Sequence, residues 1–312
     1  MHNRLSSRLL HVYRACTAPL RMARDLAQRM TDSCPVSILY YHRIAQVHPT
    51  PWTIDRQSFE AHIAWLREHF DLVDLPEAQR RITEGCRRPT VHLTFDDGYE
   101  ENDQWAIPWL LHHEIPVTYY VSTSFVSTDH SFPHDQALGL HLPANRLETL
   151  KRWQGGSVKF GAHTRTHCDL GKCTRIEQLI DEIVTSAAEL GAVLNEPLVD
   201  FAFPFGQPAN LHPMAFEICR QAGFRSVSSA YGERNYRGGD AFHLRRFHAD
   251  PLLVRMQNWL TGDPREFLRP RYRVPEFSVP ADTVVPNLLA ETERLRVSLS
   301  DKPSSPVARA SA

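Results

Sequence analysis

Two adjacent carboxylates follow a short apolar stretch in the first third of the chain. Asp96 and Asp97 come directly after residues 90–95, which read as a buried strand, and Gly98 follows them. The carboxyl ends of strands are where α/β folds place their active sites. Two neighbouring carboxylates are costly there unless a cation holds them, and a bound metal would do so. The alternative is an Asp-Gly turn without a chemical role.

A pair of histidines occupies the corresponding place after a second apolar stretch. His163 and His167 follow residues 158–162, which also read as a strand. Two histidines four residues apart can bind one metal from a single helical turn, as they do in zinc motifs. In a chain with 17 histidines the spacing could also arise by chance.

A third strand end carries the turn Phe-Ala-Phe-Pro-Phe-Gly at residues 201–206. This turn either offers a backbone N–H to a developing oxyanion or forms a buried aromatic corner. Taken together, one carboxylate and two imidazoles make a typical hydrolytic metal site that leaves positions open for water and substrate. The second carboxylate is then left to act as a base. The sequence contains neither a serine nucleophile elbow nor a glycine loop that cradles phosphate.

The elements that must position these residues alternate between strand and helix. Strands are expected at residues 36–41, 90–95, 117–122, 158–162, 201–203, 226–229 and 243–247. Helices are expected at residues 56–69, 102–113, 174–195, 211–222 and 251–260, and residues 124–146 read as a long loop. This alternation implies parallel strands with helical crossovers, and either a barrel or a doubly wound sheet satisfies it.

Composition narrows the class of protein. The 312 residues are 42% hydrophobic and 23% charged, as in an ordinary globular protein, and the net charge is −1. This balance excludes a nucleic-acid partner, which requires a basic surplus. No stretch approaches the roughly 18 apolar residues of a membrane span. Six scattered cysteines and the lack of a secretory signal favour a cytoplasmic protein.

The chain divides into three parts. Residues 35–270 hold the strands and the motifs, and residues 271–312 form an extension whose tail, past about Val297, is expected to be disordered. Residues 1–34 are basic and mixed with leucines. They predict either an amphipathic helix that contacts an anionic membrane from its inner face, or a solvated helix that packs on the body by one face.

The order of these motifs resembles the polysaccharide deacetylase family, the carbohydrate esterases similar to Nod-factor deacetylases. TFDDGY at residues 94–99, HTRTH at 163–167 and FAFPFG at 201–206 match the family's first three motifs. The opening strand, with LYYHRI at residues 39–44, looks like the start of its exopolysaccharide-type members. The resemblance covers about residues 35–260, and its second motif is more specific than its third.

The resemblance implies an α/β fold, a distorted parallel (β/α) barrel with about seven strands. It also implies a metal-dependent hydrolase that removes N-acetyl groups from hexosamine units of a bacterial-type polysaccharide or its precursor. Asp97, His163 and His167 would bind a divalent metal, most often Zn²⁺. Asp96 would be the general base, and the backbone N–H of Phe205 would help to hold the oxyanion.

Two departures from the family pattern leave two roles unassigned, those of the arginine that orients the base and of the general acid. The third motif often carries an arginine that orients the base, but this stretch is apolar here, and Arg246 is nominated in its place. The general-acid histidine is also not fixed: His248 and His243 are both near the expected position, and His42 is a third candidate. Tyr99 and Trp153, with the loop at residues 124–146, are expected to contact the substrate.

Two other functions remain open at this point. The same barrel in related families hydrolyses non-sugar amides, including cyclic ureides. Alternatively, the chain could be a carbohydrate-binding protein with a degraded site, as the missing arginine would suggest. The intact set of Asp97, His163 and His167 argues against such decay.

Overall fold

Seven parallel strands close into a barrel in the computed structural model, which describes residues 2–126, 128–268, 272–275 and 277–300. Pairing between β1 and β5 joins the two ends of the sheet, so the prediction of a barrel is confirmed over the doubly wound sheet. The ring consists of β1 (Val36–Tyr41), β5 (Thr90–Phe95), β6 (Val117–Val121), β7 (Val158–Ala162), β8 (Asp200–Ala202), β9 (Ser226–Ser229) and β10 (His243–His248). Three short strands lie beside it: β2 (Arg43–Ile44), β3 (Thr53–Ile54) and β4 (Asp71–Leu72).

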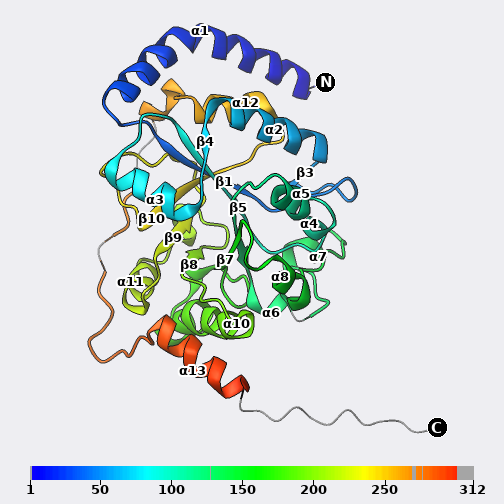
Figure 1. Ribbon diagram of the computed structural model, residues 1–312, viewed down its shortest axis with the longest axis vertical. Helices are drawn as coiled ribbons and strands as arrows, with labels where there is room; N and C mark the ends of the chain where they lie inside the picture. The colour runs from blue at the N-terminus through cyan, green and yellow to red at the C-terminus, as the bar shows by residue number, and fades with distance from the viewer. Residues whose placement is uncertain (1, 127, 269–271, 276, 301–312) are drawn as a thin grey trace, which may run out of the picture.

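Helices surround this barrel (Figure 1). Between the strands run α2 (Arg56–His69), α3 (Leu75–Glu84), α4 (Glu101–Gln104), α5 (Ala106–His112), α6 (Thr123–Val126), α7 (Pro133–Gln136), α8 (Leu147–Trp153), α9 (Ile176–Ile180), α10 (Ser186–Leu194) and α11 (Pro213–Ala222). Outside the alternation lie α1 (His2–Met30), α12 (Leu253–Leu260) and α13 (Leu288–Ser300). Short helical segments are η1 (Leu170–Lys172), η2 (Asp181–Thr185), η3 (Pro208–Asn210) and η4 (Pro264–Leu268). No helix in the described part of the chain is long and apolar enough to cross a membrane.

Many of the expected elements have the observed bounds. One expected helix is broken, and another contains a π-helical turn. The single helix expected at residues 102–113 is wrong, because the chain breaks at Trp105 (φ −155°) between α4 and α5. Pro108 explains the break, since a continuous helix would need its missing N–H and would bring its ring against the carbonyl of Gln104. The helix expected at residues 174–195 is continuous from α9 to α10 but contains a π-helical turn at η2.

The long loop expected at residues 124–146 contains part of α6 and all of α7. The sequence patterns also missed α3, α8 and α13. Because α13 continues to Ser300, disorder directly after Val297 is wrong for three residues, and the remaining tail, residues 301–312, lies outside the described residues. Leu288 and Thr292 are buried where α13 packs on α10, which accounts for the order of this helix.

The side chains of β5 divide between an apolar outer layer and a polar inner face. On β5, Val91, Leu93 and Phe95 belong to the main hydrophobic cluster beneath the helices. The alternate residues His92 and Thr94 point into the barrel, as the period of two in a strand requires. Thr94 there receives a hydrogen bond from Arg246 of β10, which is not a neighbouring strand, so both side chains must lie inside.

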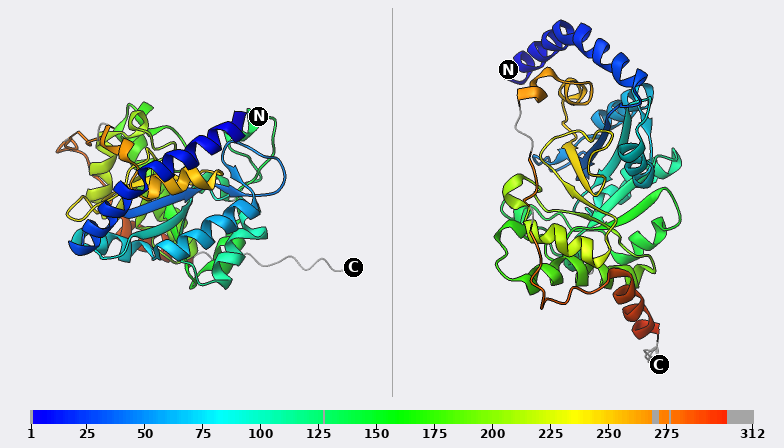
Figure 2. Two further views of the ribbon diagram at one scale, coloured as in Figure 1. Left: turned by 90° about the horizontal axis from the view of Figure 1, so that it is seen from above. Right: turned by 90° about the vertical axis from the view of Figure 1, so that its left-hand side faces the viewer.

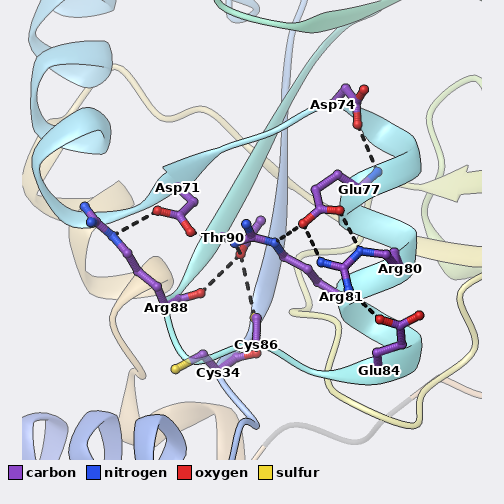
Figure 3. A network of polar contacts seen from close by, with 10 residues as sticks. All are labelled: Cys34, Asp71, Asp74, Glu77, Arg80, Arg81, Glu84, Cys86, Arg88 and Thr90. Carbon is purple, nitrogen blue, oxygen red and sulfur yellow. Dashed lines mark hydrogen bonds and ion pairs between the residues drawn. The ribbon is translucent and has the colours of Figure 1, made fainter.

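Helix α3 fastens the strands at the amino end of the barrel. Its Leu75, Ala78 and Ile82 form a separate apolar cluster with side chains of β1 and β10. On its polar side Arg81 donates to Glu77 (2.7 Å), to Asp71 of β4 (2.7 Å) and to Thr90 of β5 (2.8 Å) (Figure 3). These contacts hold the end of β5 whose opposite end carries Asp96.

Because buried histidines are neutral, we predict that the free energy of unfolding falls in mild acid. Nδ1 of His92 donates to the Val73 carbonyl and Nε2 accepts from the Thr118 hydroxyl, both at 2.9 Å. Burial, opposed by the hydrogen bond to Val73, lowers the pKa of His92 to about 4. As the pH falls from about 6.5, the unfolded chain therefore takes up the proton first. The free energy of unfolding should fall by roughly 3 kcal/mol between pH 6.5 and 4 through this residue alone.

The test is urea unfolding across this pH range, and His92→Gln should flatten the dependence. Thr118→Val is the matched control, because it removes the hydrogen-bond partner while the imidazole keeps titrating. This variant should lower stability at every pH and retain the slope. Parallel curves for wild type and His92→Gln would contradict the assignment.

Candidate active site and metal centre

A cavity opens where the carboxyl ends of the barrel strands meet. Its volume is about 220 Å³. The residues that line it are Tyr40, His42, Trp52, Asp96, Asp97, His134, His163, His167, Phe203, Phe205 and Ala230. They come from the ends of β1, β5, β7, β8 and β9 and from two loops, so residues far apart in the sequence converge here as α/β architecture predicts.

Asp97, His163 and His167 meet on one side of this cavity. Their ligand atoms lie within 4.8 Å of one another, and all three side chains are buried. Oδ1 of Asp97 lies 3.0 Å from Nε2 of His167 and 3.4 Å from Nε2 of His163. Burial opposes ionisation, yet the two imidazoles hold the pKa of Asp97 well below its ordinary value.

Two observations indicate that these three side chains could bind a divalent metal. Oδ1 of Asp97 is buried and has no well-formed hydrogen bond to any described residue. Nδ1 of His163 donates to the Ala202 carbonyl (2.8 Å), which leaves the Nε2 lone pair directed at Asp97. Such an outer hydrogen bond commonly orients histidine ligands to metals.

The backbone around these ligands is held in unusual conformations. Eight described residues other than glycine have positive φ, and four of them belong to this site: Asp97 (70°), Thr164 (63°), His167 (57°) and Phe205 (61°). The expected single helical turn at residues 163–167 is therefore wrong, since His163 and His167 converge through a strained loop. Such conformations cost on the order of 1–3 kcal/mol each and persist where a site requires them.

The second carboxylate forms a buried ion pair with the arginine nominated for it. Nη1 and Nη2 of Arg246 donate to Oδ1 and Oδ2 of Asp96 at 2.7 and 2.9 Å. Arg246 also donates to the Thr94 hydroxyl and the Ser229 carbonyl, and its guanidinium lies over the rings of Tyr40 and Tyr120. Burial alone would raise the pKa of Asp96, but the guanidinium holds it below its usual value.

The candidate general acids His42 and His248 lie next to each other. His42 lines the cavity, and burial lowers the pKa of its imidazole. His248 does not line the cavity, because its ring packs on Tyr40 (5.2 Å between centroids) and lies 5.9 Å from His42. Burial lowers the pKa of His248 to about 4. His248 thus lies beside two residues of the cavity wall, and its role as general acid stays a prediction.

Phe205 lies at the rim of the cavity. Its side chain is 51% exposed, and its ring packs edge-on against His167 at 5.1 Å. Among the described residues, none accepts a hydrogen bond from its backbone N–H. The turn therefore leaves this donor without a partner among the described residues, and its role toward an oxyanion stays a prediction.

Two residues expected to contact substrate lie elsewhere. Tyr99 is fully buried in a small cluster with Phe132, and its hydroxyl donates to Asp135 at 2.9 Å. Trp153 is 4% exposed, and its indole N–H donates to Asp103 (3.1 Å) on the outside of the barrel wall. Both assignments to the substrate site are wrong, because the side chains of Tyr99 and Trp153 are packed in the core.

The sequence patterns missed two cavity residues that loops deliver. Trp52 follows a loop that Arg43 holds through the carbonyls of Val47 (2.9 Å) and His48 (2.7 Å). His134 comes from the long loop at residues 124–146, and its Nε2 lies 3.9 Å from Oδ2 of Asp97. Burial lowers the pKa of His134 to about 4. Neither residue follows a strand of the barrel, so no pattern of barrel strands could have indicated it.

Comparison with known proteins gives one consistent family. Residues 84–227 match the model of the family described as polysaccharide deacetylase. The Bacillus subtilis protein YxkH, whose name assigns it to the same family, is 24% identical over 174 residues, which are 54% of this chain and 56% of that protein. The match thus spans little more than half of that relative's length.

Solved structures share the fold. IcaB from Ammonifex degensii superposes with a TM-score of 0.60 at 22% identity over 74% of this chain and 96% of that chain. A de-N-acetylase from Aggregatibacter actinomycetemcomitans gives a TM-score of 0.60 at 18% identity over 72% of this chain and all of that one. At these identities the likeness establishes the barrel alone.

Metal binding should be measurable without any substrate. Adding Zn²⁺ to chelator-treated protein should raise the unfolding temperature, because a ligand at 100 times its Kd stabilises the native state by about 2.7 kcal/mol. His167→Ala removes one of three ligands and should abolish most of the increase in differential scanning fluorimetry. His112→Ala, a change at an exposed histidine of α5, is the matched control and should keep the full increase. An undiminished increase in His167→Ala would place the metal elsewhere.

Proposed function

The chain belongs to the polysaccharide deacetylase family through residues 84–227, and from that premise we propose that it is a metal-dependent enzyme that removes N-acetyl groups from a glycan. One observation carries the proposal. A carboxylate–dihistidine set lies in the same 220 Å³ cavity as a second carboxylate, which a buried arginine keeps ionised. Hydrolysis of an amide needs these two functions side by side, one to activate water and one to accept its proton.

Asp97, His163 and His167 would hold the metal, with Zn²⁺ as the first choice for a site of one carboxylate and two imidazoles. When bound, it would supply Lewis-acid polarisation of the amide carbonyl and a water of lowered pKa. Asp96 accepts the proton of that water, because Arg246 keeps the carboxylate ionised and fixes both of its oxygens. A base on a rigid strand end needs little reorganisation during the reaction.

The remaining groups act on the two ends of the amide. The backbone N–H of Phe205 donates to the carbonyl oxygen as negative charge develops there. The C–N bond then breaks, and the proton that Asp96 removed passes to the leaving nitrogen, giving acetate and a free amine. His42 faces this nitrogen from the end of β1 as a hydrogen-bonding partner, and Asn102 fixes it by donating to its backbone carbonyl (2.7 Å).

The shape of the cavity supports a sugar bearing an acetamido group as the substrate. The space beside Asp96 and Asp97 is small, whereas its wall carries the aromatic rings of Trp52 and Phe205. Aromatic faces commonly pack against the apolar faces of ligands, and Phe205 is exposed enough to do so. The interior would thus receive the acetyl group while the rim contacts the rest of the hexosamine.

The direct test is acetate release from acetylated chito-oligosaccharides by Zn²⁺-loaded protein, measured beside the Asp97→Ala variant. Release by wild type and none by the variant is the expected result. Hydrolysis of small cyclic ureides without release from any acetylated sugar would instead favour a non-sugar amidase. Binding of the oligosaccharide with no turnover by metal-loaded protein would favour a carbohydrate-binding role.

The base is tested by Asp96→Asn, which keeps the size of the side chain and removes its ability to accept a proton. We expect kcat for acetate release to fall by about 10²–10⁴. Zn²⁺ binding should persist, because Asp96 is not among the three ligands, and isothermal titration calorimetry can check this. Asp135→Asn, a buried carboxylate outside the cavity wall, is the control. Turnover near the wild-type rate in Asp96→Asn would contradict the mechanism.

A further inference from the structure

Helix α1 packs on the body through its polar face and turns its apolar face outward. It lies against α12 at one extreme of the molecule, outside the ring of helices (Figures 1 and 2). A surface helix of a globular protein normally has the opposite arrangement, with its apolar stripe toward the core. Helix α1 thus packs on the body by one face, as expected, but that face is the polar one.

Hydrogen bonds hold the inner face of α1. Tyr13 donates to Asp263 (2.6 Å), and Arg14 donates to Thr261 (2.8 Å). Arg21 is 6% exposed and donates both to the Asn258 carbonyl (2.9 Å) and to the Asn258 side chain (3.0 Å). These contacts fix the rotation of the helix about its axis, so its outer face is presented by the fold itself.

The outer face of α1 is almost entirely apolar. It consists of Leu9, Val12, Ala15, Cys16, Pro19, Leu20, Met22, Ala23, Leu26, Ala27 and Met30. Its large side chains are 56–76% exposed. Between residues 8 and 30, the other exposed residues are Arg8, His11 and Arg29. A continuous apolar strip of this kind marks a docking surface.

Charge and size together indicate what this face binds. Between residues 8 and 30 the exposed charged residues are Arg8 and Arg29, both basic, so anionic lipid headgroups complement this face. A second copy fits less well, because residues 9–30 span only about 32 Å at 1.5 Å per residue. With a width of roughly 10 Å, the strip offers a few hundred Å², below the roughly 800 Å² per partner of a stable dimer. Ala15, Pro19 and Ala23 also separate its larger side chains, which weakens interlocking with a second copy.

We infer that α1 is a membrane-surface anchor, which lies in the interface of an anionic bilayer with its outer face among the acyl chains. The polar face of the helix then connects the rest of the protein to the membrane-bound helix. The chain would thus meet its substrate at a lipid surface. This inference does not depend on the deacetylase activity.

The experiment is vesicle flotation of the full chain with phosphatidylcholine alone and with phosphatidylcholine plus phosphatidylglycerol. We expect flotation with the anionic vesicles, and the doubly substituted Leu20→Gln/Leu26→Gln variant should partition at least about tenfold more weakly. Leu289→Gln/Val297→Gln on α13 is the matched control, since these side chains are 51% and 48% exposed and apolar. The control should float like wild type.

Light scattering of the same proteins without vesicles tests the alternative that a second copy of the chain covers the outer face of α1. A dimer that Leu20→Gln/Leu26→Gln dissociates, without flotation of wild type, would overturn the inference in favour of a second copy. Flotation that the two α1 substitutions leave unchanged would overturn it as well. An unchanged unfolding temperature of the variant shows that it is folded, so a loss of flotation supports the anchor.

Discussion

The site depends on the buried ion pair between Arg246 and Asp96. Removing two charges from water is costly, and a single contact would not offset the loss. Here both carboxylate oxygens are bonded, the guanidinium also reaches Thr94 and Ser229, and two tyrosine rings cover its faces. The pair reaches across β1, which lies between the strands that carry its two members.

Two neighbouring aspartates thereby acquire different roles. Asp96 continues from β5 and faces the arginine inside the barrel, whereas Asp97 adopts positive φ and turns toward His163 and His167. In the proposed mechanism, one carboxylate accepts a proton and the other binds the metal. Four of the eight described non-glycine residues with positive φ lie at this site, and the apolar outer layer of the barrel supplies the stability that tolerates their strain.

The sequence was sufficient for the parts of the site that lie on strand ends. The strand patterns and the motif spacing placed Asp96, Asp97, His163 and His167 together, and the choice of Arg246 agrees with its contacts. The patterns failed where loops decide the geometry, as for Trp52 and His134. They also failed for Tyr99 and Trp153, because an aromatic residue near a motif looks the same in sequence whether it faces a cavity or the core.

The most direct test of the central claim is the pH dependence of kcat/KM in Arg246→Lys. Only the ionised Asp96 can accept a proton, so activity should fall as the pH falls through the pKa of this carboxyl group. A lysine cannot bond both oxygens, and burial would then raise the pKa of Asp96, which moves the acid limb of the profile to higher pH. We predict this upward displacement in protein that still binds Zn²⁺. An acid limb at the same pH as in wild type would contradict the claim that Arg246 keeps the base ionised.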